Sequence, residues 1–420
     1  MSGRVRIRLL DTRPLHGSPA FRDLWIGTSV SQLGGQIANV AVLAQVWELT
    51  GSPVGTGVIG LATGLPMVLF GLLGGTLADI ADRRTVVWAT TAGQLLAAAG
   101  LCVQALVDNR SVPLLLALVA IRTSCGALGA PARRTFPVRL LPGDQVAAGL
   151  ALTSVSFQTA MLTGPALAGV IIARWELPAA YATQAVATAV AMLAVIRLPA
   201  MRPEGADAAG GRRRAERGGW RVVLRRPTLW GSMATDLSAT LLAMPIALFP
   251  LVNEIRFGGD PRTLGLFLSA VAVGGITAGL LSGTVTRWRR SGLVQISAAG
   301  VWGLGLAGFG LAGPLWLALG CLAVAGAADT VSVVTRSALV QLETPDAYRG
   351  RVSSVEHVIG VAGPELGNFR GGLLASATSA PVSLVVGGLS AVLAIAAVSA
   401  ANAPLRAYRT PPAAGGGVGE

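Results

Sequence analysis

Several ionisable side chains lie inside long apolar stretches of the sequence, and the first candidates among them are Arg122, Asp236, His357 and Glu365. A charged group at the centre of a membrane helix costs about 2.5–3.5 kcal/mol on insertion scales, so such a group faces a cavity or a partner. An acid held there can carry a proton, a histidine can titrate near neutrality, and an arginine remains a fixed positive charge. These residues are therefore candidates for proton coupling or for binding a polar substrate within a bilayer.

Each candidate also has a structural alternative. Asp236 could be an acid paired with an arginine or a helix end, and Arg122 could belong to a static ion pair between helices. His357, as a lone histidine, could be a satisfied packing residue. Glu365 and Arg370 are poorly placed to share one helix face, so we expect Glu365 to face a cavity and Arg370 to extend outward to the membrane surface.

Amide side chains follow one another along the first apolar stretch. Gln32, Gln36 and Asn39 fall at helical spacing on one face. They could line the cavity and form hydrogen bonds to the substrate. Polar packing between helices would use the same residues.

The composition indicates a membrane-embedded chain. Of the 420 residues, 52% are hydrophobic and 13% are charged, whereas soluble proteins average about 25% charged residues. The net charge of +13 comes from arginines, and these cluster in short loops between apolar stretches, as the positive-inside rule requires. This pattern argues against a nucleic-acid partner, and no metal-binding cluster is evident.

The apolar stretches number about twelve, since a helix needs about 20 apolar residues to cross a bilayer. The candidate spans are 24–48, 54–78, 86–107, 112–130, 146–173, 178–198, 228–252, 263–285, 293–312, 314–335, 351–376 and 381–402. An even number places both termini on one side. The arginine-rich loops predict that this side is the cytoplasm of a bacterial cell.

A polar segment divides the chain into two halves. We predict a six-helix half over 1–198, a cytoplasmic linker over 199–227, a second six-helix half over 228–402 and a disordered cytoplasmic tail over 403–420. The two halves are weakly similar in sequence. Leu141-Pro142-Gly143-Asp144 follows the fourth span, and the similar Thr344-Pro345-Asp346 follows the tenth, which is the fourth span of the second half. Parallel repeats of this kind place a substrate site near the bilayer midplane.

Three short motifs resemble those of the major facilitator superfamily of secondary transporters. They are Gly75-x-x-x-Asp79 followed by Arg83-Arg84, Arg122-x-x-x-Gly126-x-x-Gly129-Ala130, and Gly164-Pro165-x-x-x-Gly169. The first is similar to the signature loop after the second helix, and the second to the fourth-helix motif of proton-coupled exporters. The third is similar to the fifth-helix antiporter motif. The resemblance implies a fold of two pseudo-symmetric six-helix halves.

Two longer blocks resemble the branch of the superfamily that contains the enterobactin exporter and drug–proton antiporters. One runs from Asp236 to Pro250, and the other from Ala328 to Gly372. Charged pairs and helix-end contacts near the inner surface would hold a cytoplasmic gate shut, with substrate contact as the alternative role of the same residues: Asp79, Arg83, Arg84, Asp329 and Arg336. The sequence departs from the pattern of the branch at Ile80, Asp82 and Glu356-His357.

The sequence predicts a transporter and not an enzyme. No catalytic signature stands out, and without lysine the chain cannot contain a Gly-x-x-x-x-Gly-Lys phosphate loop. The resemblance implies export of a siderophore or an amphipathic drug-like molecule by alternating access, driven by the proton gradient without a cofactor. We expect a multi-pass, monomeric protein of the bacterial cell membrane. An importer, a lipid flippase or a sensor without transport activity are the alternatives on the same scaffold.

Overall fold

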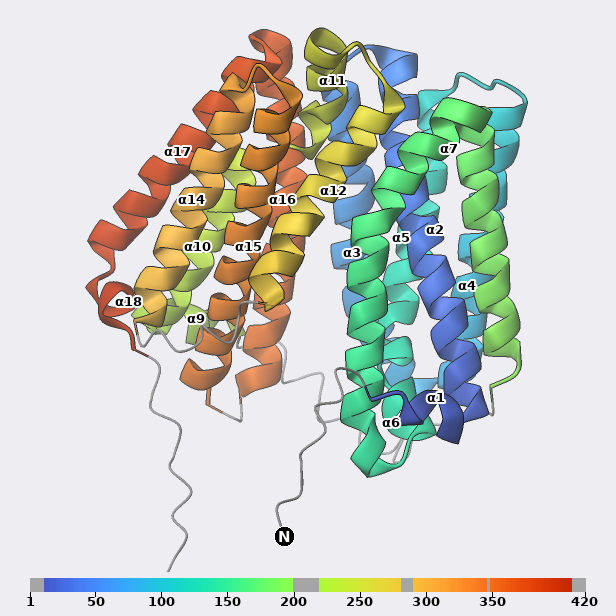
Figure 1. Cartoon of the computed structure of the whole chain (residues 1–420). Helices are drawn as coiled ribbons and strands as arrows, with labels where there is room; N and C mark the ends of the chain where they lie inside the picture. The colour runs from blue at the N-terminus through green and yellow to red at the C-terminus, as the bar shows by residue number, and fades with distance from the viewer. Residues whose placement is uncertain (1–10, 199–218, 281–289, 346–347, 410–420) are drawn as a thin grey trace, which may run out of the picture. The chain divides into compact units, whose positions relative to one another are not determined.

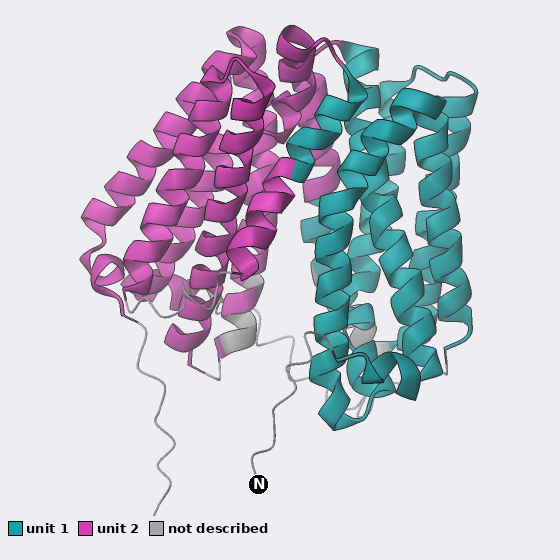
Figure 2. Ribbon diagram, viewed as in Figure 1, with its two compact units in different colours: residues 1–50, 65–209, 260–269 teal, residues 51–64, 210–259, 270–420 magenta. Residues whose placement is uncertain are grey.

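The computed structural model describes residues 11–198, 219–280, 290–345 and 348–409, and regular structure within these ranges is helical (Figure 1). Two compact units are formed (Figure 2). Unit 1 comprises Met1–Thr50, Leu65–Ala209 and Asp260–Ser269, and unit 2 comprises Gly51–Gly64, Gly210–Gly259 and Ala270–Glu420.

Unit 1 is built around α2, which packs along α7, and α4, which packs on α5 and α7. Its helices are α1 (Arg13–Gly17), α2 (Pro19–Thr50), most of α3 (Pro53–Ile80), α4 (Arg83–Leu106), α5 (Val112–Arg134), α6 (Phe136–Leu140), η1 (Gly143–Gln145), α7 (Val146–Ile196) and the start of α12 (Pro261–Leu280). Helix α7 is interrupted at Glu176, where φ is 63° and ψ is −178°. This break lies between the predicted fifth and sixth spans and confirms that they are separate.

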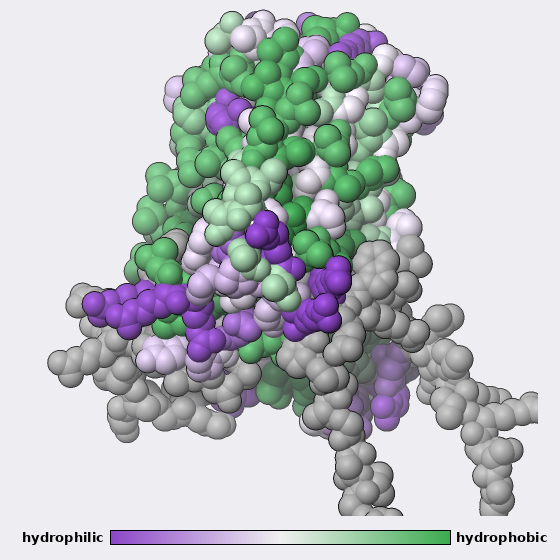
Figure 3. All heavy atoms as spheres, turned by 90° about the vertical axis from the view of Figure 1, so that its left-hand side faces the viewer, coloured by the Kyte–Doolittle hydropathy of each residue, from purple (hydrophilic) through white to green (hydrophobic). Residues whose placement is uncertain are grey.

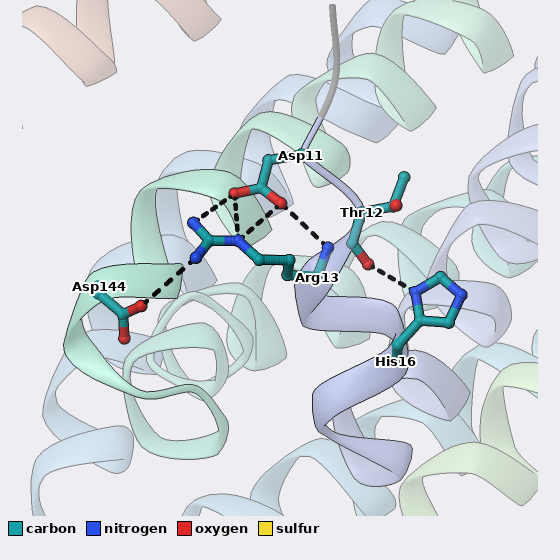
Figure 4. Close-up of polar contacts among 5 residues, drawn as sticks. All are labelled: Asp11, Thr12, Arg13, His16 and Asp144. Atoms are coloured by element: carbon teal, nitrogen blue, oxygen red, sulfur yellow. Dashed lines mark hydrogen bonds and ion pairs between the residues drawn. The ribbon is translucent and has the colours of Figure 1, made fainter. Parts of the chain in front are cut away.

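The first residue of α1, Arg13, interacts with charged side chains of the preceding segment and of η1 (Figure 4). The Arg13 guanidinium donates to Asp11 from Nε at 2.9 Å and from a terminal nitrogen at 2.7 Å, and it lies 3.8 Å from the Asp144 carboxylate. His16 Nδ1 lies 3.0 Å from the Thr12 carbonyl oxygen. Exposed ion pairs contribute little to stability, so these contacts mainly orient α1. Asp144 is the last residue of Leu141-Pro142-Gly143-Asp144, the first copy of the motif that is repeated in the two halves. This contact gives that copy a structural role.

Unit 2 packs α10 on α16 and α17, and α14 on α15 and α17. Its helices are the start of α3, α9 (Gly219–Arg225), α10 (Pro227–Ala243), η4 (Ile246–Leu248), α11 (Phe249–Phe257), most of α12, α14 (Ser291–Leu311), α15 (Leu315–Glu343), α16 (Arg349–Ala377), α17 (Ala380–Ala401) and α18 (Ala403–Ala407). A buried cluster that includes Leu229, Leu339, Val355 and Leu405 joins α10, α15, α16 and α18.

The units differ from the sequence halves at two helix starts. Gly51–Gly64, at the beginning of α3, belongs to unit 2, where Gly64 packs directly against Glu365 on α16. Asp260–Ser269, at the beginning of α12, belongs to unit 1, where Gly265 packs against the backbone of α7. Glycine permits both approaches, since a Cβ atom would collide with the facing helix.

The exterior is that of a membrane protein. Among the described residues, nine helical stretches are long and apolar enough to cross a membrane, and one of them, Gly143–Ile196, contains the break in α7. Helices α2 and α16, which carry more polar residues, complete the predicted layout of about twelve helices in two halves. Figure 3 shows the α17 side of unit 2, where apolar side chains cover most of the height and hydrophilic ones gather at the lower end. The all-α membrane fold predicted from the sequence is confirmed.

Two predicted segments require correction. The seventh span, 228–252, is not one helix, because α10 ends at Ala243 and the chain passes through η4 before α11 begins. Pro245 causes the break, since it has no N–H for the helix ladder. The tail predicted to be disordered from residue 403 begins instead with α18, which is capped by Asn402 and buries Leu405. Residues 199–218 of the linker and 410–420 of the tail lie outside the described residues, and the end of the linker contains α9.

Candidate functional site

A buried cluster of charged side chains joins three helices of unit 2. Arg336 on α15 forms an ion pair with Asp236 on α10, and its Nε atom lies 3.3 Å from Oε1 of Glu356 on α16. The Ser337 hydroxyl donates to the same Glu356 oxygen at 3.1 Å. Asp236 is 4% exposed and Arg336 is 7% exposed, so one guanidinium links two acids from different helices with little access for solvent.

Asp329 adds a third acid to this charged cluster. It lies two turns before Arg336 on α15 and interacts electrostatically with both Asp236 and Arg336. Among the side chains that the structure describes, the cluster therefore has three carboxylates and one guanidinium group. Within the described residues, no group of His, Cys, Asp or Glu is arranged to hold a metal ion. Excess negative charge in a low-dielectric site can be reduced by binding a proton.

The structure brings together residues to which the sequence assigned separate roles. Asp236 was a candidate for proton coupling, whereas Asp329 and Arg336 were candidates for a cytoplasmic gate, yet all of them belong to one cluster. In the sequence, Glu356 stands out only as a departure from the family pattern. An acid inside an apolar span was the available signal, but its spacing did not reveal Arg336 as its partner.

His357 lies next to Glu356 on α16 but is not buried with it. Its side chain is exposed on the helix, because consecutive residues on a helix point about 100° apart. Its role in proton coupling stays a prediction.

Unit 1 holds a second polar group, formed by Arg122 and two of the predicted cavity-lining amides. A terminal nitrogen of Arg122 on α5 donates to Asn39 Oδ1 on α2 at 2.7 Å. Asn39 Nδ2 lies 3.5 Å from Gln36 Oε1, and Gln36 Nε2 lies 2.9 Å from the Met161 sulfur on α7. The sequence predicted both the arginine and the amide face, but not their direct contact. Gln32 lies one turn before Gln36 and is half-buried.

The predicted antiporter motif on α7 is a packing surface in unit 1. A Cβ atom added to Gly164 would lie 2.5 Å from the Gln36 Cβ atom, so this glycine sets how closely α7 approaches the amide face of α2. Gly169 faces Pro261 at the start of α12, and an added Cβ atom would lie 2.7 Å from the Pro261 carbonyl oxygen. The carbonyl of Pro165 faces Gly265 on α12. The motif thus brings α2 and α12 against α7.

The signature loop positions helix ends. The Asp82 carboxylate accepts from the Arg84 N–H at 3.3 Å and from the Thr85 hydroxyl at 3.1 Å, so Asp82 caps the start of α4. Arg84 donates to the carbonyl of Ile196, the last residue of α7, at 2.7 Å, and Arg83 is half-buried at the start of α4. The side chain of Asp79 lies outside the described residues. A gating role for this loop stays a prediction.

Glu365 lies where α16 meets the start of α3. Its carboxyl group is within hydrogen-bonding reach of Thr63 and Asn368. Cβ atoms added to Gly60 and Gly64 would each lie 2.6 Å from an atom of Glu365. Within the part of the chain that the structure describes, no arginine interacts with this acid. A carboxyl group among neutral partners can alternate between charged and protonated forms, in keeping with the predicted coupling role.

Side chains from α16 and α3 form hydrogen bonds to the backbone groups around the break after α10. Arg370 donates from Nε to the Leu241 carbonyl at 3.0 Å and from a terminal nitrogen to the Leu242 carbonyl. Asn368 Oδ1 accepts from the Ala247 N–H at 3.2 Å, and the Thr56 hydroxyl donates to the Ala247 carbonyl at 2.6 Å. The expectation that Arg370 extends outward to the membrane surface is therefore wrong: it turns inward because the broken helix leaves carbonyl groups without donors.

A profile of the family described as "Transmembrane secretion effector" matches residues 13–411. The chain belongs to this family. It is accordingly a multi-pass membrane transporter of the major facilitator superfamily and not an enzyme, as the short motifs indicated.

Relatives and solved structures agree with this assignment. The chain is 27% identical to the enterobactin exporter EntS of Citrobacter koseri, over 96% of this chain and 97% of the relative. It is 26% identical to EntS of Escherichia coli O1:K1 / APEC, with the same coverage. A bacterial homologue of the human lysosomal transporter Spinster superimposes with a TM-score of 0.68 at 15% identity, covering 96% of this chain and all (100%) of that one. The nucleoside transporter NupG gives 0.71 at 15% identity, over 91% and 98%. At these identities the structural matches establish the fold alone.

Proposed function

We propose that this chain is a proton-driven exporter of a siderophore or a similar amphipathic small molecule, working by alternating access in the bacterial cell membrane. The charged cluster around Arg336 is the observation that carries the proposal. Two of its acids, Asp236 and Glu356, contact the Arg336 guanidinium, and Asp329 interacts with it electrostatically. With every group charged, the cluster has excess negative charge away from water, and one proton relieves part of that excess.

The position of the cluster supports a link between proton binding and movement. Its members come from α10, α15 and α16, so a change in protonation alters the forces among three helices at once. Alternating access in this superfamily moves helices around a central site. A proton taken up on one side of the membrane and released on the other would bias this movement in one direction. The enterobactin exporters among the relatives support the choice of cargo class and of export.

Transport in proteoliposomes tests the proposal. Proteoliposomes that are acidic inside should accumulate radiolabelled enterobactin or ethidium as protons leave, and a protonophore should abolish the accumulation. Flux that is unchanged after the gradient is dissipated would contradict proton coupling. Absence of flux for both probes would contradict the exporter assignment, and counterflow from both faces separates export from import or lipid flipping.

We expect Asp236→Asn to abolish gradient-driven accumulation, because the cluster loses a carboxyl group that can exchange a proton. Counterflow of the same probe at equal pH should persist, since it requires alternating access but no net proton movement. Asp108→Asn is the matched control, because Asp108 is 85% exposed in the loop after α4. Normal accumulation by Asp236→Asn would remove this residue from the mechanism.

We further propose that both termini face the cytoplasm and that the chain works as a monomer with two six-helix halves. The distribution of arginine in the loops supports the orientation. A reporter enzyme that is active only in the periplasm should stay inactive when fused after residue 420 and become active when fused in the loop that contains Asp108. The reverse pattern of reporter activity would show that both termini face the periplasm.

A further inference from the structure

The polar group of unit 1 has the character of a ligand site. Asn39 lies near the middle of α2, and its side chain is exposed although its neighbours Ala38 and Val40 are fully buried. Arg122 lies near the middle of α5 and contacts it. Because lipid cannot solvate an amide or a guanidinium group, a face that carries both lines a water-accessible interior.

The chemistry of this face is rich in hydrogen-bond donors. Asn39 Oδ1 accepts from Arg122, and Gln36 Oε1 lies against the Asn39 amide nitrogen. The acceptor atoms of both amides are thus engaged within the group. A guanidinium has five N–H donors and each amide has two, so most donors remain for a ligand. Gln36 directs one donor to the sulfur of Met161, which is only a weak acceptor.

The positive charge of this face also has no counterion among the residues that the structure describes. No carboxylate interacts with Arg122 anywhere in the described ranges of the chain. The neighbouring Tyr181 contributes no compensating charge, since its hydroxyl donates to Gln45 at 2.7 Å. A cation in such a place favours an anionic ligand, and the planar guanidinium fork suits paired oxygen atoms.

We infer that Arg122, Asn39 and Gln36 form a binding site for an anionic oxygen pair of the cargo, such as a carboxylate. This inference deepens the proposed function and rests on it, because it names the chemical class of the transported molecule. It assigns Arg122 to substrate recognition, whereas the charged cluster of unit 2 serves proton coupling.

Binding of salicylate and its neutral isostere salicylamide to the purified protein in maltoside detergent provides the test, measured by saturation-transfer NMR without any pH gradient. Salicylate should bind at least about tenfold more tightly, because a hydrogen bond to a charged group exceeds the corresponding neutral one. Equal binding of the two compounds by the unaltered protein would overturn the inference, and this comparison does not depend on any variant folding.

Asn39→Asp supplies the sharper variant. It retains Arg122 but places a carboxylate at the position of the amide oxygen, 2.7 Å from the guanidinium in the unaltered protein. Salicylate affinity should fall to the level of salicylamide, as it should in Arg122→Gln. Arg174→Gln removes an exposed arginine and should leave affinity unchanged. Undiminished binding by Asn39→Asp would contradict the site.

Two further comparisons are needed. One distinguishes a cargo anion from a lipid headgroup, and the other distinguishes failure of this inference from failure of the proposed proton-driven export. If salicylate binds in preference to salicylamide but phosphatidylglycerol displaces it, the anion site is a lipid headgroup site and the cargo inference fails. Since no proton gradient is present, loss of proton-driven transport in the earlier experiment leaves the binding result intact. Conversely, preserved proton-driven export without anion preference overturns only the inference on cargo class.

Discussion

Arg336→Gln is expected to destabilise the protein by about 3–5 kcal/mol, the range found when one partner of a buried ion pair is removed. Arg336 is the guanidinium that faces both Asp236 and Glu356. Its removal leaves buried acids to repel one another without a counterion. Unfolding of the purified protein in mixed detergent micelles, followed by tryptophan fluorescence against SDS concentration, measures the loss.

Compensating substitutions show whether Arg336 stabilises the protein through its charge or through the shape of its side chain. Adding Asp236→Asn and Glu356→Gln to Arg336→Gln should recover much of the lost stability, because the uncompensated charges disappear. Arg336→Lys should be intermediate, since a single ammonium cannot reproduce a fork that reaches two acids on different helices. Arg110→Gln, which alters an arginine 76% exposed, is the control. A stable Arg336→Gln protein would show that the cluster does not depend on this cation.

Arg370→Gln should cost about 2–4 kcal/mol, because two half-buried carbonyls lose their donor and each loss falls in the lower part of a range of about 1–3 kcal/mol. The sequence explains why the donor is needed. In a helix the carbonyl of Leu241 accepts from the residue four positions later, which is Pro245 and has no N–H. The Arg370 guanidinium replaces this missing donor from α16.

A double-mutant cycle with Pro245→Ala tests this explanation. Alanine restores an N–H at position 245, so Arg370→Gln should be less damaging in the Pro245→Ala protein than in the unaltered one. The same SDS titration measures all four proteins, with Arg262→Gln, an exposed arginine on α12, as control. Equal costs of Arg370→Gln in both backgrounds would mean that Arg370 acts independently of the helix break.

Much of the fold could be predicted because a bilayer imposes a simple rule on sequence. Each helix must supply about 20 apolar residues, so the spans could be recognised in the sequence as long apolar stretches. The break in α7 at Glu176 and the short connection between α14 and α15 both lie where the pattern placed a boundary. Apolar composition continues through Pro245, however, and therefore concealed the end of α10.

The candidate site was predicted as a set of residues but not as an arrangement. The cost of burying polar groups marked Arg122, Asp236 and Glu365 individually. Their partners lie on other helices, and helix rotation and packing decide which faces meet. For this reason Glu356 became a partner of Arg336, and Arg370 turned inward to α10.

By itself the sequence determined that this protein spans a membrane many times, that it resembles secondary transporters, and which polar residues lie within the apolar spans. These properties depend on composition and local spacing, which every helix carries in its own residues. Only the tertiary structure decided that Arg336 links acids from two other helices and that Arg122 meets an amide face instead of a carboxylate. Charge pairing depends on distances between residues far apart in the chain, and close packing at glycines sets those distances.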